Sequence, residues 1–136
     1  MNQPDADFMK SYRRHVLWNE TGGRDGEVLF LQGETFSTMD FSGMDLSGCH
    51  FTECDFTMCD FSDSQLVGSH LSYCCFKRAN FARSNLQKST LWSSDFRGCD
   101  FNDADLRRCD FVGANFQGVD LSNSRYEPVR LTTAKR

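Results

Sequence analysis

The chain lacks the features that mark membrane-spanning and secreted proteins. No segment approaches the roughly 18 consecutive apolar residues of a membrane helix. Residues 1–10 contain no basic region followed by an apolar run, which is the pattern of a secretion signal. We therefore expect a cytoplasmic protein that makes no contact with a membrane.

Motifs for catalysis and cofactor binding are also missing. The sequence holds no phosphate-binding loop, no H-E-x-x-H motif and no pairing of a nucleophile with a base. The 7 cysteines are an odd number in a chain without a secretion signal, which argues against a disulfide framework. We expect no enzyme activity, no catalytic residues and no cofactor.

The 136 residues do contain one long, uninterrupted repeat, of a length that suits a single domain. From Leu31 onward an apolar residue occupies every fifth position. A small residue mostly lies two positions earlier, and Asp or Asn mostly lies directly before it. The apolar positions are Phe36, Phe41, Leu46, Phe51, Phe56, Phe61, Leu66, Leu71, Phe76, Phe81, Leu86, Leu91, Phe96, Phe101, Leu106, Phe111, Phe116, Leu121 and Tyr126.

This period of five excludes both regular helices and regular strands, whose periods are about 3.6 and 2. The chain must turn at fixed intervals, with the apolar and small residues pointing inward and polar, turn-prone residues facing water. Taking apolar residues twenty positions apart gives columns of mostly one residue type. One such column contains only Phe, and another contains mostly Leu. These columns are Phe36, Phe56, Phe76, Phe96 and Phe116, and Leu46, Leu66, Leu86, Leu106 and Tyr126. The sorting indicates four repeats per coil and nearly five coils, stacked about 4.8 Å apart.

The pattern, as seen in residues 79–83, 104–108 and 114–118, resembles the pentapeptide-repeat family over about 34–128. The resemblance implies an all-β fold, a right-handed quadrilateral β-helix. It says little about function, because the repeated residues build the core. Members of the family that are named for an activity include the fluoroquinolone-resistance proteins, which look like double-stranded DNA and bind gyrase.

The ends of such a rod need caps, because its first and last coils would otherwise expose apolar side chains. Residues 1–33 are predicted to form an N-terminal cap with a helix over about 5–19. Asp5 or Asp7 is the expected N-cap, and Phe8, Tyr12 and Val16 share one face. Gly22 and Gly23 are expected to end the helix, and 28–31 to form an irregular first side of the coil.

Further predictions concern Trp18 and the bounds of the rod. Trp18 is expected to form a lid on the N-terminal end, with ligand binding as the less favoured alternative. Residues 34–128 form the predicted β-helix, and 129–136 a mobile basic tail with Arg130, Lys135 and Arg136.

The repeat assigns most of the cysteines and histidines to packing. Cys49, Cys54 and Cys59 lie five residues apart in the inward slot that Ser and Ala also fill, whereas zinc ligands favour gaps of about two to four residues. Cys75 alone occupies the outward Asp/Asn position, so it is the thiol expected to react first. His50 and His70 would stack and could bind a metal weakly, but no carboxylate is obliged to join them. We expect no metal site.

Charge is distributed unevenly along the chain and around the coil. Between Asp25 and Phe76 there are acidic residues but no Lys or Arg, and basic residues follow from Lys77 onward. The side of the coil built on Phe41, Phe61, Phe81, Phe101 and Leu121 is acidic, with Arg83 as its one basic residue. Its carboxylates are Asp40, Asp60, Asp63, Asp100, Asp103 and Asp120.

The favoured hypothesis is a binding protein that imitates double-stranded DNA and occupies the DNA-binding groove of a partner, which it inhibits or shields. The partner would be a DNA-binding protein or enzyme complex, such as a topoisomerase, a nuclease or a defence complex. No direct binding to nucleic acid is expected, and the protein would be a monomer or homodimer. The partner-binding residues would be those of the acidic side together with Asp45, Glu53 and Asp55.

Two other interpretations stay open. The chain could be a rigid docking or scaffold module, because an exposed Trp92 is unusual on such a rod and often marks an interface. That interface would consist of Trp92, Arg78, Arg83, Lys88, Arg107 and Arg108. Alternatively, the Asp and Asn residues only keep the rod solvated and prevent it from stacking on others.

Overall fold

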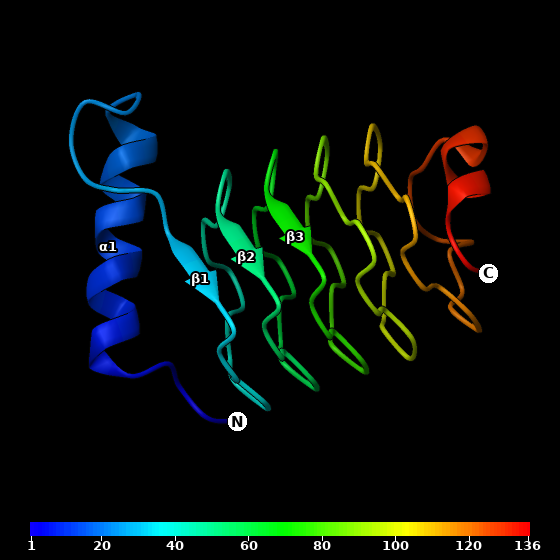
Figure 1. Ribbon diagram of the computed structural model, residues 1–136, viewed down its shortest axis with the longest axis horizontal. Helices are drawn as coiled ribbons and strands as arrows, with labels where there is room; N and C mark the ends of the chain where they lie inside the picture. The colour runs from blue at the N-terminus through cyan, green and yellow to red at the C-terminus, as the bar shows by residue number, and fades with distance from the viewer.

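The computed structural model is a rod of stacked coils with a helix across its N-terminal end (Figure 1). It describes the backbone of residues 1–136 and every side chain except that of Val129. The helix α1 spans Ala6–Glu20, and the strands β1, β2 and β3 span Phe30–Gln32, His50–Thr52 and His70–Ser72. A 3-10 helix, η1, spans Pro128–Thr133.

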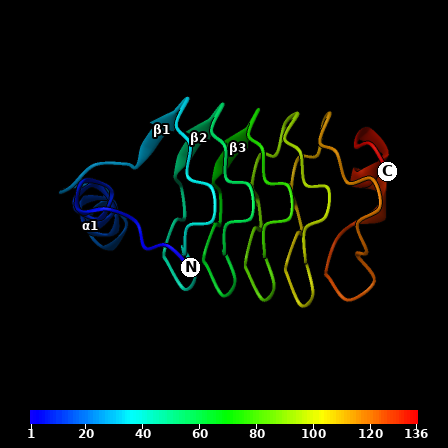
Figure 2. The same cartoon turned by 90° about the horizontal axis from the view of Figure 1, so that it is seen from below.

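One coil takes twenty residues, as the sequence predicts. The parallel sheet β1-β2-β3 pairs Phe30 with His50 and His50 with His70. Isolated parallel bridges keep the same offset elsewhere, for example between Asp40 and Asp60. The coil has four sides, and Figure 2 shows that the coils follow one another along a straight rod. The predicted quadrilateral β-helix is confirmed.

We name the four sides by their inward apolar columns. Side A contains Leu31, Phe51, Leu71, Leu91 and Phe111, and side B contains Phe36, Phe56, Phe76, Phe96 and Phe116. Side C contains Phe41, Phe61, Phe81, Phe101 and Leu121, and side D contains Leu46, Leu66, Leu86, Leu106 and Tyr126. Side A lies opposite side C, because each coil passes through A, B, C and D in turn.

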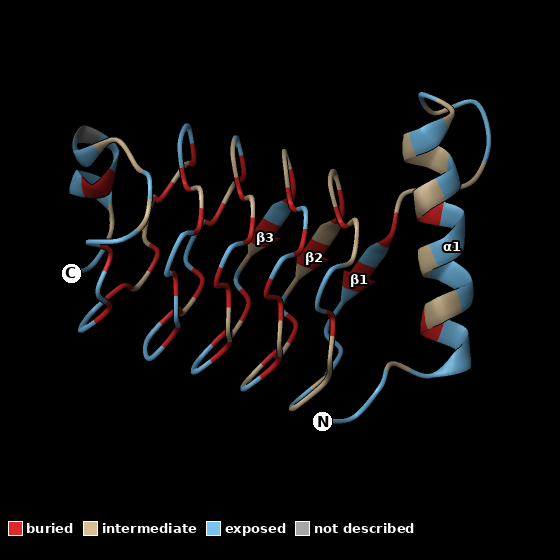
Figure 3. Ribbon diagram, turned by 180° about the vertical axis from the view of Figure 1, so that it is seen from behind, coloured by how far each residue is buried: buried red, intermediate tan, exposed pale blue. Residues whose placement is uncertain are grey.

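The core consists of these columns, and Figure 3 shows the buried residues inside every coil. Within a column the rings stack in parallel: Phe61 and Phe81 have centroids 5.1 Å apart and an interplanar angle of 5°. Neighbouring columns meet edge to face, as Phe56 and Phe61 do at 5.3 Å and 73°. Such pairs add about 0.5–1.5 kcal/mol each beyond the burial of area. The Phe and Leu columns therefore supply most of the stabilisation.

The small inward residues fill the corners of the coil and bond to its backbone. The thiol of Cys99 donates to the carbonyl of Phe76 (2.8 Å), and the hydroxyl of Ser64 donates to that of Phe61 (2.6 Å). Every cysteine of the chain is a free thiol, and all of them except Cys75 are buried. The prediction that six cysteines serve packing is confirmed.

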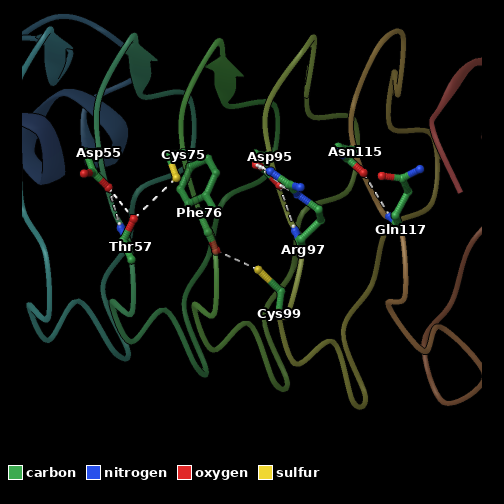
Figure 4. A network of polar contacts seen from close by, with 9 residues as sticks. All are labelled: Asp55, Thr57, Cys75, Phe76, Asp95, Arg97, Cys99, Asn115 and Gln117. Carbon is green, nitrogen blue, oxygen red and sulfur yellow. Dashed lines mark hydrogen bonds and ion pairs between the residues drawn. The ribbon is translucent and has the colours of Figure 1, made fainter.

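The residue before each apolar centre has a structural role that the sequence did not reveal. Its carboxylate or amide oxygen accepts a hydrogen bond from the backbone N–H two residues further on, as Asp60 does from Ser62 (2.8 Å). Figure 4 shows this bond on side B at Asp55, Asp95 and Asn115. Asp and Asn stabilise turns in this way. The preference for these residues therefore reflects the turn and not only solvation.

The turns also place many residues other than glycine in the left-handed region of φ. Asp63 has φ of 59° and Arg83 of 60°, two residues after their apolar centres. Left-handed backbone is costly for residues with a Cβ unless the surroundings fix it. Pairing with the coils above and below provides that constraint, since the N–H of Asp63 donates to Ala82 O and that of Arg83 to Asn102 O.

Helix α1 begins as predicted, at the N-cap Asp5, whose carboxylate accepts from the N–H of Phe8 (2.8 Å). Its buried residues are Phe8 and His15, and Tyr12, which was predicted to share the face of Phe8, also packs against the core. The lid is Phe8, which lies 5.2 Å from Phe41 edge to face.

Trp18 was the wrong prediction for the lid. It is not part of the apolar core, and its indole lies against the loop, 3.2 Å from where a Cβ on Gly23 would be. Trp18 lies on another face of the helix, because residues 8, 12, 15 and 19 form the face that contacts the first coil.

Side chains of α1 satisfy the free edge of the first coil. Tyr12 accepts from the N–H of Asp45 (2.9 Å), and His15 Nδ1 accepts from the N–H of Leu29 (2.9 Å). His15 Nε2 and Asn19 both bond to the carbonyl of Ser47, at 2.9 and 3.0 Å. The cap thus provides hydrogen-bond partners as well as apolar cover.

Two boundaries differ from the sequence prediction. Residues 29–33 are a regular side of the rod, since β1 pairs with β2 in the common register. The segment 129–136, predicted to be a mobile tail, packs on the rod as part of η1 and the last rung: Leu131 is buried, and Lys135 pairs with Asn115. The physical reason is that Leu131 continues the five-residue period and extends the column of side A.

Candidate interaction surfaces

Side C brings six of the predicted partner-binding carboxylates together. Bridges align Asp40 with Asp60, and Asn80 with both Asp60 and Asp100. Successive rungs of such a ladder lie about 4.8 Å apart. Asp63 and Asp103 stand at the corner of the same side and are exposed. Asp40, Asp60 and Asp100 therefore form one row together with Asn80; Asp63 and Asp103 lie beside it, and Asp120 follows on the last coil.

Local hydrogen bonds and one ion pair favour the ionised form of three of these carboxylates, those of Asp40, Asp63 and Asp120. The hydroxyl of Ser42 donates to Asp40 (2.6 Å) and lowers the pKa of that carboxyl. The backbone N–H of Ser122 does the same for the pKa of Asp120. Arg83 forms a two-pronged ion pair with Asp63 (2.9 and 3.0 Å), which lowers the pKa of the Asp63 carboxyl. Arg83, the one cation of side C, is thus paired.

The structure does not bring the remaining predicted acidic residues to side C. Asp45 is on side D, where its N–H bonds to Tyr12 under the cap. Glu53 is on side A, and Asp55 on side B, where it accepts from the N–H and hydroxyl of Thr57. The acidic stretch of the sequence surrounds the N-terminal half of the rod and does not form one surface.

The residues of the alternative interface are also divided among sides. Arg78 lies on side B and Arg83 on side C, while Lys88, Arg107 and Arg108 lie on side D. Trp92 is on side A. Arg107 pairs with Asp105 (2.7 Å), as Arg97 does with Asp95 (2.6 Å; Figure 4). Sides B and D border side A, so of these residues only Arg83 lies on the side opposite Trp92.

Side A carries an aromatic row, in which the predicted stacking of His50 on His70 and the exposure of Trp92 are confirmed, while Phe30 and Tyr73 were missed by sequence reasoning. Phe30 stacks on His50 at 6.3 Å between centroids, and His50 on His70 at 4.3 Å. Phe30, Tyr73, Trp92 and Val112 are all exposed on this side. The signal was available, because taking every twentieth residue also sorts outward positions by side.

The thiols and histidines form no metal centre in the part of the chain that the structure describes, where no three His, Cys, Asp or Glu side chains converge. Cys75 is half-exposed and its sulfur lies 3.3 Å from the hydroxyl of Thr57 (Figure 4). A hydrogen bond with Cys74 lowers the pKa of the Cys54 thiol to about 7, but Cys54 is buried.

Stacked coils with a sealed core define a repeat solenoid whose chemistry lies on its sides. Residues 49–126 match the family model described as a pentapeptide repeat region. The chain belongs to the pentapeptide-repeat family. Among its described residues, no helix is both long and apolar enough to span a bilayer.

Solved pentapeptide-repeat proteins are similar in structure. HetL from the cyanobacterium Nostoc, a protein involved in heterocyst differentiation regulation, is 16% identical over 74% of this chain, with a TM-score of 0.57. The chain spans 45% of the length of HetL. Rfr23 from the cyanobacterium Cyanothece is 17% identical over 79% of this chain and 87% of its own, with a TM-score of 0.48.

Full-length QnrB1, a plasmid-mediated fluoroquinolone resistance protein, is 22% identical over 78% of this chain and 71% of its own, with a TM-score of 0.47. No curated protein sequence matches the chain significantly. The likeness to HetL supports the fold alone.

Proposed function

We propose that side C occupies the DNA-binding groove of a partner protein and competes there with DNA. The observation that carries this proposal is the straight row of carboxylates on one side of a rigid rod, with Arg83 as the one cation and Asp63 already paired to it. A protein with this role binds and does not catalyse.

The charge density of side C is close to that of one DNA strand. Its six carboxylates and one cation are spread over about 19 Å, or one net negative charge per about 4 Å. A DNA strand carries one phosphate charge per about 3.4 Å of helix axis. Side C therefore suits a groove that holds about five or six phosphates of a single strand.

The turn bonds make this charge row rigid. Asp60 and Asp100 each accept a backbone N–H through Oδ1, at 2.8 Å, which restricts the direction of the carboxylate and leaves Oδ2 outside the turn bond. Preorganised charges lose little side-chain entropy on binding and steer association with a basic partner. Residues that stabilise the turn thus also present the negative charge.

Fewer of the predicted residues support the alternative function, a docking module. Of its residues, Arg83 lies on side C, opposite Trp92, whereas Lys88, Arg107 and Arg108 lie on side D, which borders side A.

The test removes charge but keeps the turn bond. Asn can accept the same backbone N–H as Asp, so replacing Asp40, Asp60, Asp100 and Asp120 by Asn should leave the rod folded. We expect the wild type to inhibit a DNA-dependent enzyme such as gyrase, or a DNA-binding protein captured from lysate, in competition with a short duplex. The fourfold Asn variant should lose this competition.

The matched control removes the same number of charges from other sides, with Asp55, Asp95, Asp105 and Asp110 changed to Asn. This control should compete with DNA like the wild type. Equal loss in both variants would show that only net charge matters, and full retention in the side C variant would refute the proposal.

A further inference from the structure

Side A concentrates the exposed apolar surface of the rod. Phe30 is 62% exposed, Tyr73 59%, Trp92 45% and Val112 51%. Tyr73 and Trp92 are neighbours, because the N–H of Tyr73 donates to the carbonyl of Trp92 (2.9 Å). Exposed aromatic residues of this kind are enriched at the centre of protein interfaces. Side A therefore differs from the three polar sides in its chemistry.

The same side is open and nearly uncharged. Its rungs 29–33, 49–53, 69–73, 89–93 and 109–113 contain no Lys or Arg, and their only carboxylates are Glu53 and Asp110. The last rung of this side, which Leu131 begins to close, adds Arg130, and that guanidinium is paired with Glu127 (3.4 Å). In Figure 2 the strands β1–β3 form the upper side of the rod, and neither α1 nor η1 projects beyond it. A second rod can approach this side without obstruction.

We propose that side A binds a second copy of this chain, with the two rods antiparallel and related by a two-fold axis between the rungs of Leu71 and Leu91. Such an axis keeps each outward column facing the same column of the partner and reverses the order of the rungs. The rung of Leu71 then faces that of Leu91, and the rung of Phe51 faces that of Phe111.

This arrangement places large side chains against small ones. Trp92 faces Ser72 of the second copy, because both follow their apolar centres directly. Tyr73 faces Ser93, since both occupy the next position along. The two-fold axis repeats each contact, so the centre of the interface would hold two Trp and two Tyr side chains. Self-complementarity of this kind is what a two-fold interface requires.

The polar groups on side A agree with the same pairing. His50 and Asp110 both precede their apolar centres, and their rungs face each other, so each imidazole can donate a hydrogen bond to a carboxylate of the second copy. Glu53 faces Gly113, which carries no like charge.

The size of side A sets the strength of the dimer. A flat side with rungs about 4.8 Å apart covers well under the roughly 800 Å² per partner of a standard interface. We therefore infer a weak dimer that forms at high protein concentration. The dimer leaves both acidic sides C facing outward in opposite directions, and it does not depend on the proposed competition with DNA.

Sedimentation velocity over a concentration series tests the association. The wild type should shift from monomer to dimer as its concentration rises toward about 1 mM, as expected for a small interface. Trp92→Asp should weaken the dimer by about tenfold or more, because it removes two central contacts. The control Met58→Asp changes a residue that is 44% exposed on side B and should have no effect. A wild type that stays monomeric throughout, or an equal effect of Met58→Asp, would overturn the proposal.

Cross-linking tests the orientation. In a Cys75→Ser background, Thr52→Cys and Val112→Cys face each other only in the antiparallel dimer, and three rungs separate them within one chain. Facing sides of packed sheets lie about 10 Å apart, which is too far for a direct disulfide. Mixing the two single variants with a short bis-maleimide cross-linker should give a linked heterodimer, while each variant alone should give little product. Linked species from single variants at equal yield would refute the antiparallel arrangement. In the sedimentation experiment, Val112→Asp takes the place of Trp92→Asp if circular dichroism shows that the Trp92 variant is misfolded.

Discussion

Sides A and C share one repeat and one core, yet they differ in the residue that precedes each apolar centre. On side C this residue is Asp or Asn, and its side chain bonds to the turn, as at Asp100 and Asn102 (2.8 Å). On the first rungs of side A it is Phe30, His50 or His70, and there the backbone forms the strands β1, β2 and β3. The extended rungs of side A are thus ones that lack the Asp or Asn acceptor of the turn bond.

A substitution in the core should lower the stability of the rod the most, because sides A and C are both built on that core. Phe81→Asp places a carboxylate between Phe61 and Phe101, whose rings each lie 5.1 Å from that of Phe81. Burying an unpaired charge costs several kcal/mol, so we expect the rod to unfold. Circular dichroism during thermal unfolding measures this, with the exposed Asn102→Asp as the matched control. A cooperative transition near the wild-type temperature would contradict the inward assignment of Phe81.

The turn bond of side C should have a smaller, measurable effect. Asp60→Ala removes the acceptor of the Ser62 N–H and should lower the free energy of unfolding by about 1 kcal/mol. Asp60→Asn keeps the acceptor and should cost much less. Urea denaturation of the three proteins gives the comparison. If both variants lose the same stability, the charge and not the turn bond matters at this position.

Acid should weaken the N-terminal end of the rod. Burial lowers the pKa of His15 below its usual value, and Asp45 is the charged group that opposes this shift. Because the folded-state pKa is lowered, the stability that neutral His15 provides is complete above pH of about 6.5 and is lost as the pH falls toward the lowered value.

Burial, His70 and His15 lower the pKa of His50 in the same direction. Urea midpoints at pH 7.5 and 5 measure the combined effect. His15→Gln can still accept from Leu29 and donate to Ser47, so it should reduce the pH dependence. An unchanged pH dependence in this variant would assign the effect to other groups.

The smallest change in stability is expected at Cys75. Its thiol is the half-exposed one, whereas the other cysteines are buried. Cys75→Ser should leave the urea midpoint unchanged and abolish labelling by a thiol reagent under native conditions. Mass spectrometry after brief labelling checks this. Early modification of Cys54, whose pKa is lowered to about 7, would show that the coils open more readily than the packing suggests.

The core could be predicted from the sequence because it obeys a single period. One rule places Phe81, Cys99 and Leu106 inside without reference to any other part of the chain. The same rule would have placed Leu131 in the rod, had the pattern been followed past Pro128. The error there came from the assumption that Pro ends the repeat, whereas η1 accommodates it and returns the chain to the register.

The hydrogen bonds of the cap and the grouping of surface residues were harder to predict from the sequence. A helical wheel identifies an apolar face but does not show that His15 and Asn19 bond to the edge of the first coil. The acidic side C was found by sorting residues at intervals of twenty. The basic interface was assembled from positions close in sequence, and these lie on different sides. Only the offset of twenty carries information about surface neighbours.

The core repeats every five residues, whereas a surface neighbour returns only every twenty. An insertion of one pentapeptide would therefore leave the interior acceptable, since every column takes Phe or Leu. All later residues would move by one side, so Asp100 and Asp120 would leave side C for side D. Lineages of such rods can thus rearrange their surfaces abruptly, by the gain or loss of one short unit, while they keep a foldable core.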